Sequence, residues 1–128
     1  EIVPTVPYTQ EDLNWNNAQS RSSMEMRDPN SRPEIGSKLL DPALYRVIFV
    51  GFPIWWYVAP HIINTFLESY DLTGKTIIPF ATSGGSSMGQ TPVHLRPSAE
   101  GAVVKEGRRF DMGETPMAIN SWIAALGL

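Results

Sequence analysis

Residues 46–50 read Arg-Val-Ile-Phe-Val, and residues 75–81 read Lys-Thr-Ile-Ile-Pro-Phe-Ala. Both runs consist mainly of β-branched and aromatic residues and lack the polar alternation of a strand with one exposed face. We therefore predict two parallel strands that are covered on both faces, the first of them central in its sheet. Pro79 has no amide proton to donate, which predicts a bulge or a strand end at this position.

Helical patterns alternate with these strands. Pro60 stands at a first helical position, and apolar residues recur at helical spacing from there until Gly74. Val103 and Val104 predict a further strand, and Thr115-Pro116 predicts a capped start for a last helix. The apolar stripes are Ile62, Ile63, Phe66, Leu67 and Tyr70 in the first helix and Ile119, Trp122, Ile123 and Leu126 in the last. This alternation predicts an α/β fold with a mainly parallel sheet.

The first part of the chain gives weaker signals. Residues 1–6 predict a short strand, and the polar stretch from Pro7 to Pro33 predicts a long loop in which residues 12–15 could form one helical turn. A weak helical pattern covers residues 31–40 before Asp41-Pro42 ends it. Loops of this length without periodicity are typical of functional or mobile segments.

Length and composition define the class of protein. The 128 residues predict a single domain over residues 1–128, and 42% apolar with 18% charged residues is the balance of a folded chain. A net charge of -3 and a pI near 5.3 argue against nucleic acid and membrane surfaces as partners. The chain has no cysteine, which excludes disulfides, thiolate metal sites and a cysteine nucleophile and fits a cytoplasmic protein. We expect no transmembrane segment and no signal peptide.

Two unusual loops follow the two predicted strands. Residues 51–59 read Gly-Phe-Pro-Ile-Trp-Trp-Tyr-Val-Ala, and residues 82–89 read Thr-Ser-Gly-Gly-Ser-Ser-Met-Gly. Open parallel sheets bind ligands at the carboxyl ends of their strands, where both loops fall. The three consecutive aromatic rings favour a flat ligand, while the glycine and serine residues offer backbone amides and hydroxyls. Together they predict a slot for a planar heterocycle with polar edges.

Each loop also has a simpler interpretation. Trp55 and Trp56 could cover the end of the sheet as part of the core, and the glycine-serine stretch could be a flexible turn. That stretch lacks both the lysine of a nucleoside triphosphate loop and the spaced glycines of a dinucleotide fingerprint. His61 beside the predicted helix start could polarise a bound ring or be a surface or packed imidazole.

Four stretches of the chain closely resemble the flavodoxin family: residues 47–56, 60–67, 74–80 and 82–86. The resemblance is closest to short bacterial flavodoxin-like proteins, whose polar loop carries similar stretches at residues 8–13 and 31–33. It implies a three-layer sandwich with strand order 2-1-3-4-5 that binds FMN without a covalent bond. By position, the residues flanking the flavin ring would be Pro53, Ile54, Trp55, Trp56 and Tyr57, and those meeting its pyrimidine edge would be Thr82, Ser83, Gly84, Gly85 and Ser86.

The chain departs from the family at its start. Family members begin with a strand and a T-x-T-G-x-T turn that holds the FMN phosphate at a helix N-terminus. Residues 1–4 correspond to the family's second strand, so the first strand, the phosphate loop and the first helix are missing from this sequence. Of two explanations, a truncated chain and a naturally shortened homologue, we favour the first. Either one predicts weakened affinity for FMN.

The resemblance implies an FMN-dependent electron carrier or small oxidoreductase. Its partners would be the flavin and either a redox protein or a small-molecule electron acceptor. The alternative is a degenerate, non-enzymatic module that self-associates without cofactor, for example as a homodimer, through its aromatic loop and an open sheet edge. No catalytic side chains are predicted, and with two histidines and no cysteine we expect no transition-metal site.

Overall fold

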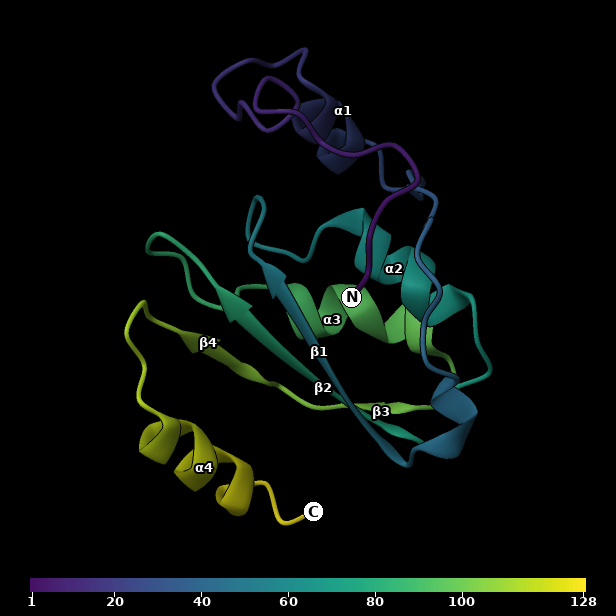
Figure 1. The fold of residues 1–128 in the computed structure, drawn as a ribbon, viewed down its shortest axis with the longest axis vertical. Coiled ribbons are helices and arrows are strands. Elements are labelled where there is room, and N and C mark those ends of the chain that lie inside the picture. Colours follow the sequence, from purple (N-terminus) through teal and green to yellow (C-terminus); the bar gives the residue numbers. More distant parts are fainter.

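The computed structural model describes residues 1–128 and has a parallel sheet of four strands at its centre (Figure 1). The strands are β1 (Val47–Pro53), β2 (Thr76–Thr82), β3 (Val103–Val104) and β4 (Arg108–Phe110). β1 pairs with β2 along its whole length, and β3 and β4 both pair with the other side of β2. The predicted α/β fold and parallel sheet are therefore confirmed.

Pro79 lies inside β2, not at a strand end, and the interruption that it was expected to cause falls in the facing strand. β3 ends opposite Ile77, and β4 begins opposite Phe80, so the pairing on this side skips Ile78 and Pro79. Residues 105–107 span this gap; Gly107 has a φ of +74°, and a Cβ on it would lie 2.0 Å from the Pro79 carbonyl oxygen. β3 and β4 thus behave as one strand that is broken where only glycine fits.

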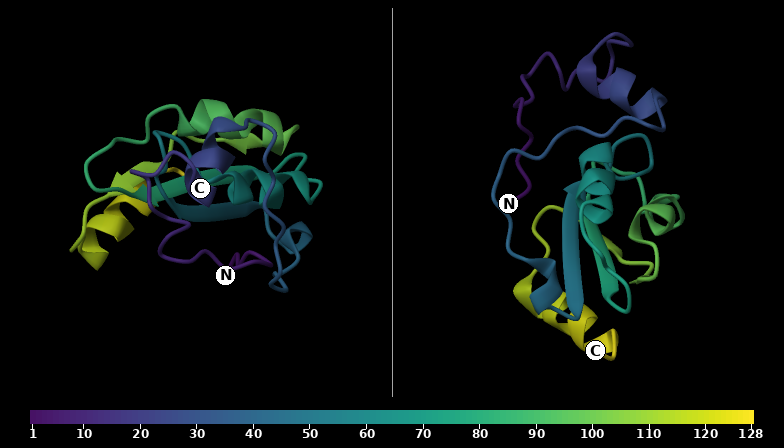
Figure 2. Two further views of the ribbon diagram at one scale, coloured as in Figure 1. Left: turned by 90° about the horizontal axis from the view of Figure 1, so that it is seen from above. Right: turned by 90° about the vertical axis from the view of Figure 1, so that its right-hand side faces the viewer.

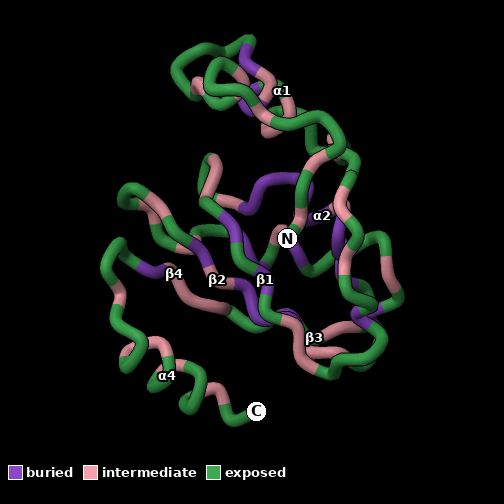
Figure 3. The backbone as a smooth tube through the Cα atoms, viewed as in Figure 1, coloured by how far each residue is buried: buried purple, intermediate pink, exposed green.

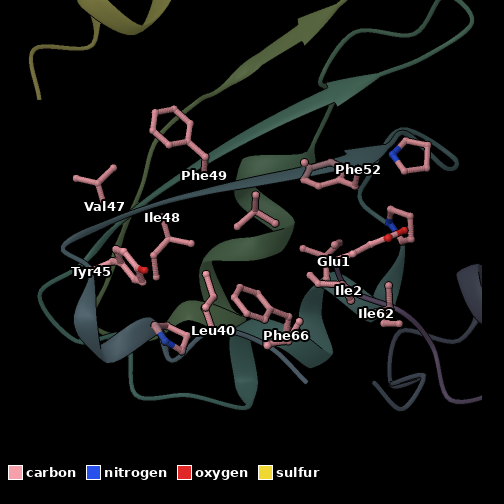
Figure 4. A pocket seen from close by; sticks show the side chains of 17 residues that line it. Glu1, Ile2, Leu40, Tyr45, Val47, Ile48, Phe49, Phe52, Ile62 and Phe66 are labelled. Atoms are coloured by element: carbon pink, nitrogen blue, oxygen red, sulfur yellow. The ribbon is translucent and has the colours of Figure 1, made fainter. Parts of the chain in front are cut away.

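β1 is an edge strand, so the prediction that it is central in its sheet was wrong, and one of its two faces is only partly covered. Phe49 is 39% exposed, and the far edge of β1 pairs with no other strand. A groove of about 630 Å³ runs beside it, lined by β1, residues 39–45, the second helix and Ile2 (Figure 4). An apolar run indicates that a strand is buried on its faces, but it carries no information about a neighbour along its edge.

Helices cover both faces of the sheet, giving three layers (Figure 2). α2 (His61–Glu68), α3 (Thr91–Leu95) and the 3₁₀ turn η2 (Arg96–Ala99) share one hydrophobic core with β1 and β2. α4 (Pro116–Ala125) lies on the opposite face and begins at Thr115, whose hydroxyl accepts a hydrogen bond from the Ala118 amide at 3.2 Å. This cap confirms the predicted helix start. No helix in the structure is long and apolar enough to cross a membrane.

The region before β1 differs most from expectation. The predicted strand over residues 1–6 is reduced to a single antiparallel bridge between Pro4 and Ile35. The predicted helix over residues 31–40 is extended, because the Thr5 amide donates to Glu34 and the Gly36 amide donates to Val3, both at 2.8 Å. The structure also contains a 3₁₀ turn that was not predicted, η1 (Pro42–Leu44).

A short helix within the polar stretch was also missed. α1 (Arg21–Arg27) begins after Ser20, whose hydroxyl accepts a hydrogen bond from the Ser23 amide. The helical turn expected at residues 12–15 starts earlier, with the Leu13 amide donating to the Thr9 carbonyl at 3.2 Å. Residues 7–33 stand beyond the carboxyl end of β1 and are mostly exposed (Figure 3). We call this segment the cap.

Candidate functional site

The chain makes a tight turn directly after β1, with two aromatic residues at its tip. The Trp55 amide donates to the Val58 carbonyl at 2.9 Å, and the Val58 amide donates back to Trp55 at 3.1 Å. Trp56 and Tyr57 between them have φ values of +47° and +66°. Two-residue turns of this kind usually hold Asn-Gly, since a left-handed backbone costs other residues about 1–3 kcal/mol each. The turn therefore holds two aromatic residues in a backbone conformation that Asn and Gly adopt at a lower energetic cost.

The strain presents aromatic surface to solvent. Trp56 is 45% exposed and Tyr57 is 66% exposed. The other members of the predicted ring-flanking set lie differently: Pro53 is exposed at the end of β1, and Ile54 packs against the core. Of this set, Trp56 and Tyr57 are the two residues that project from the turn.

The second loop holds the aromatic turn in place from the side. The Ile54 amide donates to the Thr82 carbonyl at 2.9 Å, and the Gln90 amide donates to the Tyr57 carbonyl at 3.2 Å. Gly89 passes so close that a Cβ on it would lie 2.6 Å from the Tyr57 carbonyl oxygen, and its φ is +55°. The structure therefore brings the two predicted loops together at the carboxyl edge of the sheet.

Residues 83–86 form the open side of this arrangement. A Cβ on Gly84 or Gly85 would meet no atom within 4 Å. The amides of Gly84, Gly85 and Ser86 donate to no acceptor within the chain. The loop keeps its shape through Ser83, whose hydroxyl donates to the Ser86 carbonyl. It thus offers space and free amide donors next to the aromatic turn.

Trp55 is covered by the cap, which the sequence did not predict. The Tyr8 ring packs edge-on against Trp55 with centroids 5.5 Å apart, and the Arg21 guanidinium lies 3.8 Å above the Tyr8 ring. The Tyr8 hydroxyl donates to Glu25 at 2.5 Å, and burial, followed by this carboxylate, raises the pKa of Tyr8. Trp55 therefore packs against the cap and has a structural role, while Trp56 is available to a ligand.

His61 is a packed residue. It is 2% exposed, its Nδ1 lies 2.5 Å from the Ser31 hydroxyl, and its ring stacks on His94 with centroids 5.6 Å apart. Burial lowers the pKa of both imidazoles, and His94 lowers that of His61 further. Both histidines thus lie at the contact between α2, α3 and the cap.

Arg109 is a charged residue at the site that sequence reasoning missed. It comes from β4, and its Nε donates to the Ser83 hydroxyl at 2.8 Å. The two residues are 26 positions apart in the chain, and no local pattern links them. The pairing of β4 with β2, which sets Arg109 opposite Ala81, brings them together.

The combination of exposed rings, open space and free amides fits a planar heterocycle with hydrogen-bonding edges. The rings supply flat apolar surface, and the amides supply donors for ring oxygens and nitrogens. No group of three or more histidine, aspartate or glutamate residues lies close enough to hold a metal ion. An open parallel α/β sheet with helices on both faces and such loops at its carboxyl edge defines the doubly wound α/β class.

Comparison with known proteins identifies the family. The flavodoxin family model matches residues 1–126, and the chain therefore belongs to the flavodoxin family. No curated protein matches the chain. Two crystal structures, each of a "putative flavoprotein", resemble it across nearly its whole length. The one from Bacteroides eggerthii is 48% identical with a TM-score of 0.89 and covers 99% of this chain and 79% of its own.

The second, from Bacteroides uniformis, has the same identity and TM-score and covers 97% of this chain and 79% of its own. A flavoprotein in complex with FMN from Lactobacillus acidophilus is 21% identical, with a TM-score of 0.58 over 80% of this chain and 65% of its own. This third likeness establishes the shared fold. The flavodoxin-like resemblance of the sequence is thus confirmed.

Proposed function

We propose that this chain holds a flavin ring between the aromatic turn and residues 82–86, and acts as an FMN-dependent electron carrier or small oxidoreductase. The observation that carries the proposal is the strained turn. Backbone strain of this kind persists where the surrounding structure enforces it, and it is concentrated at functional sites. Here it places Trp56 and Tyr57 beside a loop with three free amides.

The chain's own residues would position the ring. Trp56 and Tyr57 would lie against its flat surface and exclude water there, while the amides of Gly84, Gly85 and Ser86 would bind its pyrimidine edge. When bound, the flavin supplies the electron or hydride transfer. Family membership and the FMN complex of the Lactobacillus acidophilus flavoprotein support this choice of ligand.

The phosphate group of FMN would be bound by groups other than those that bind the ring. Each charge-assisted hydrogen bond to a phosphate contributes about 1.5–3 kcal/mol, so a phosphate site can dominate affinity. In this proposal both loops described above would contact the ring and not the phosphate. We therefore expect riboflavin, which lacks the phosphate, to bind this chain within about tenfold of FMN, a difference of about 1.4 kcal/mol.

The test is a titration of the chain with FMN and with riboflavin, following the quenching of flavin fluorescence. Trp56→Ala should weaken both ligands by about tenfold or more, because aromatic stacking on a heterocycle contributes about 1–3 kcal/mol. Trp15→Ala is the matched control, since Trp15 is a largely exposed tryptophan in the cap. Absence of saturable binding by the unchanged chain, or equal losses in the two variants, would contradict the proposal.

The non-enzymatic alternative is favoured by one specific observation, the unpaired edge of β1 with its apolar groove. Strand edges of this kind pair with other chains. Sedimentation at several protein concentrations would measure self-association in the unchanged chain, Trp55→Ala and Trp56→Ala. A dimer that is lost in these variants, without any change in flavin binding, would support the alternative.

A further inference from the structure

Arg109 holds the glycine-serine loop closed through a chain of two hydrogen bonds. Its Nε donates to the Ser83 hydroxyl at 2.8 Å, and that hydroxyl donates to the Ser86 carbonyl. The guanidinium therefore fixes the two ends of residues 83–86, while the amides of Gly84, Gly85 and Ser86 donate to no acceptor in the chain. Arginine suits this task because its planar group is always charged and its donors have fixed directions.

The positive charge of Arg109 is only partly neutralised. Its Nη2 contacts Asp111 at 2.5 Å, but the Asp111 side chain is 72% exposed while that of Arg109 is 25% exposed. Water screens an exposed carboxylate more than a half-buried cation. The neighbouring Arg108 points elsewhere, to Glu114 at 3.3 Å and over the Phe110 ring. A cationic field therefore acts on the loop from Arg109.

We propose that Arg109 is the positioning residue of the flavin site and raises the reduction potential of the bound ring. This inference rests on the proposed function. An oxidised, neutral ring that takes up two electrons and one proton gains one negative charge. The electrons come from an external donor, which is dithionite in the experiment below, and the proton comes from water. A cation beside residues 83–86 stabilises the charged, reduced ring more than the neutral one.

The shift in reduction potential is linked thermodynamically to the affinities of the chain for the oxidised ring and for the reduced ring. If Arg109 favours the reduced ring, its removal must weaken binding of the reduced ring more than binding of the oxidised ring. For a two-electron couple, each tenfold by which the variant loses more affinity for the reduced ring than for the oxidised ring lowers the midpoint potential by about 30 mV. A role in maintaining the fold alone would weaken both redox states equally.

The experiment compares Arg109→Gln, Arg109→Lys and the control Arg108→Gln, with riboflavin as the ligand so that no phosphate charge contributes. Dissociation constants are measured for oxidised and dithionite-reduced riboflavin, together with the midpoint potential. Arg109→Gln should lose about tenfold more affinity for the reduced ring than for the oxidised one. Arg109→Lys should restore most of the potential, and Arg108→Gln, which removes the same charge from the same strand, should leave it unchanged.

A second measurement tests the positioning role without any flavin. Backbone order parameters of residues 84–86, from NMR relaxation, should be lower in Arg109→Gln than in Arg108→Gln, because the hydrogen bond from Arg109 to Ser83 is lost. Equal order parameters in the two variants, or equal losses for both redox states, would overturn the inference while leaving flavin binding intact. If the unchanged chain binds no riboflavin, the proposed function fails and the potential-setting role falls with it.

Discussion

The two faces of the sheet are covered to very different depths, although β1 and β2 supply apolar side chains to both. On one face, Val50 and Ile77 are buried under α2 and α3 in the main core. On the other, α4 buries none of its own residues, and contact runs through a thin layer of rings. Trp122 meets Phe49 at 6.0 Å and Phe110 at 5.3 Å between centroids. We therefore expect the face under α2 and α3 to contribute more to the stability of the fold than the face under α4.

The largest expected effect comes from the deeply covered face. Leu67 of α2 is almost completely buried in the core, and Leu67→Ala should lower the free energy of unfolding by about 3 kcal/mol, within the usual 2–5 for such cavities. Urea denaturation followed by circular dichroism measures it. Ile123→Ala on α4 is the control and should cost under about 1 kcal/mol. Equal losses would remove the difference between the faces.

A large ring on the thinly covered face, under α4, should contribute less to the free energy of unfolding than its size suggests. Trp122→Ala removes the side chain that joins Phe49 to Phe110, but the ring is only partly buried. We expect a loss of about 2 kcal/mol, below the 3–5 found for fully buried tryptophan. The same denaturation experiment tests this, and a loss above that of Leu67→Ala would reverse the ranking.

Adding volume probes the thin face from the opposite direction. A Cβ on Gly51 would lie 2.4 Å from the tip of the Phe80 ring, so Gly51→Ala should cost about 1 kcal/mol, the lower end for overpacking, as the ring can move. Gly85→Ala, where a Cβ meets nothing within 4 Å, is the control. Thermal unfolding should separate the two variants by several degrees. No difference would mean that the thin face is loose.

The smallest expected effect is a pH dependence confined to the deeply covered face. Burial lowers the pKa of His61 and His94 below the ordinary 6.5. Just below pH 6.5 the unfolded chain therefore binds more protons than the folded chain. Stability should therefore fall as the pH drops below 6.5 and level off beneath the folded pKa values. Urea midpoints at pH 7.5 and 5.5 measure the change. His94→Gln should reduce it and Trp122→Ala should not; the opposite pattern would contradict this assignment.

The sequence predicted the elements that local patterns determine. The apolar runs located β1 and β2, and the Thr115-Pro116 pair located the start of α4. It failed where the structure depends on distant partners. Residues 34–36 pair with residues 3–5 instead of forming a helix, and β1 lies at the edge of the sheet. Neither outcome can be deduced from a local period.

The candidate site shows the same division. The sequence correctly indicated that two unusual loops meet at the carboxyl edge of the sheet. It could not show that the cap covers Trp55 while Trp56 stays exposed, because Tyr8 lies 47 positions before Trp55 and carries no helical or strand pattern. It also could not predict left-handed backbone at Trp56 and Tyr57, since aromatic residues rarely adopt it.

The strained turn also has a consequence for the order of folding. An unfolded chain seldom samples positive φ at two successive aromatic residues, so the turn cannot nucleate the pairing around it. It depends on Gly89 and Gln90, which reach Tyr57 only once β1 and β2 have paired. Substitutions in the turn should therefore change the rate of unfolding and leave the rate of folding almost unaltered. We therefore expect the part of the molecule that would meet the ligand to form late in folding and to open early in unfolding.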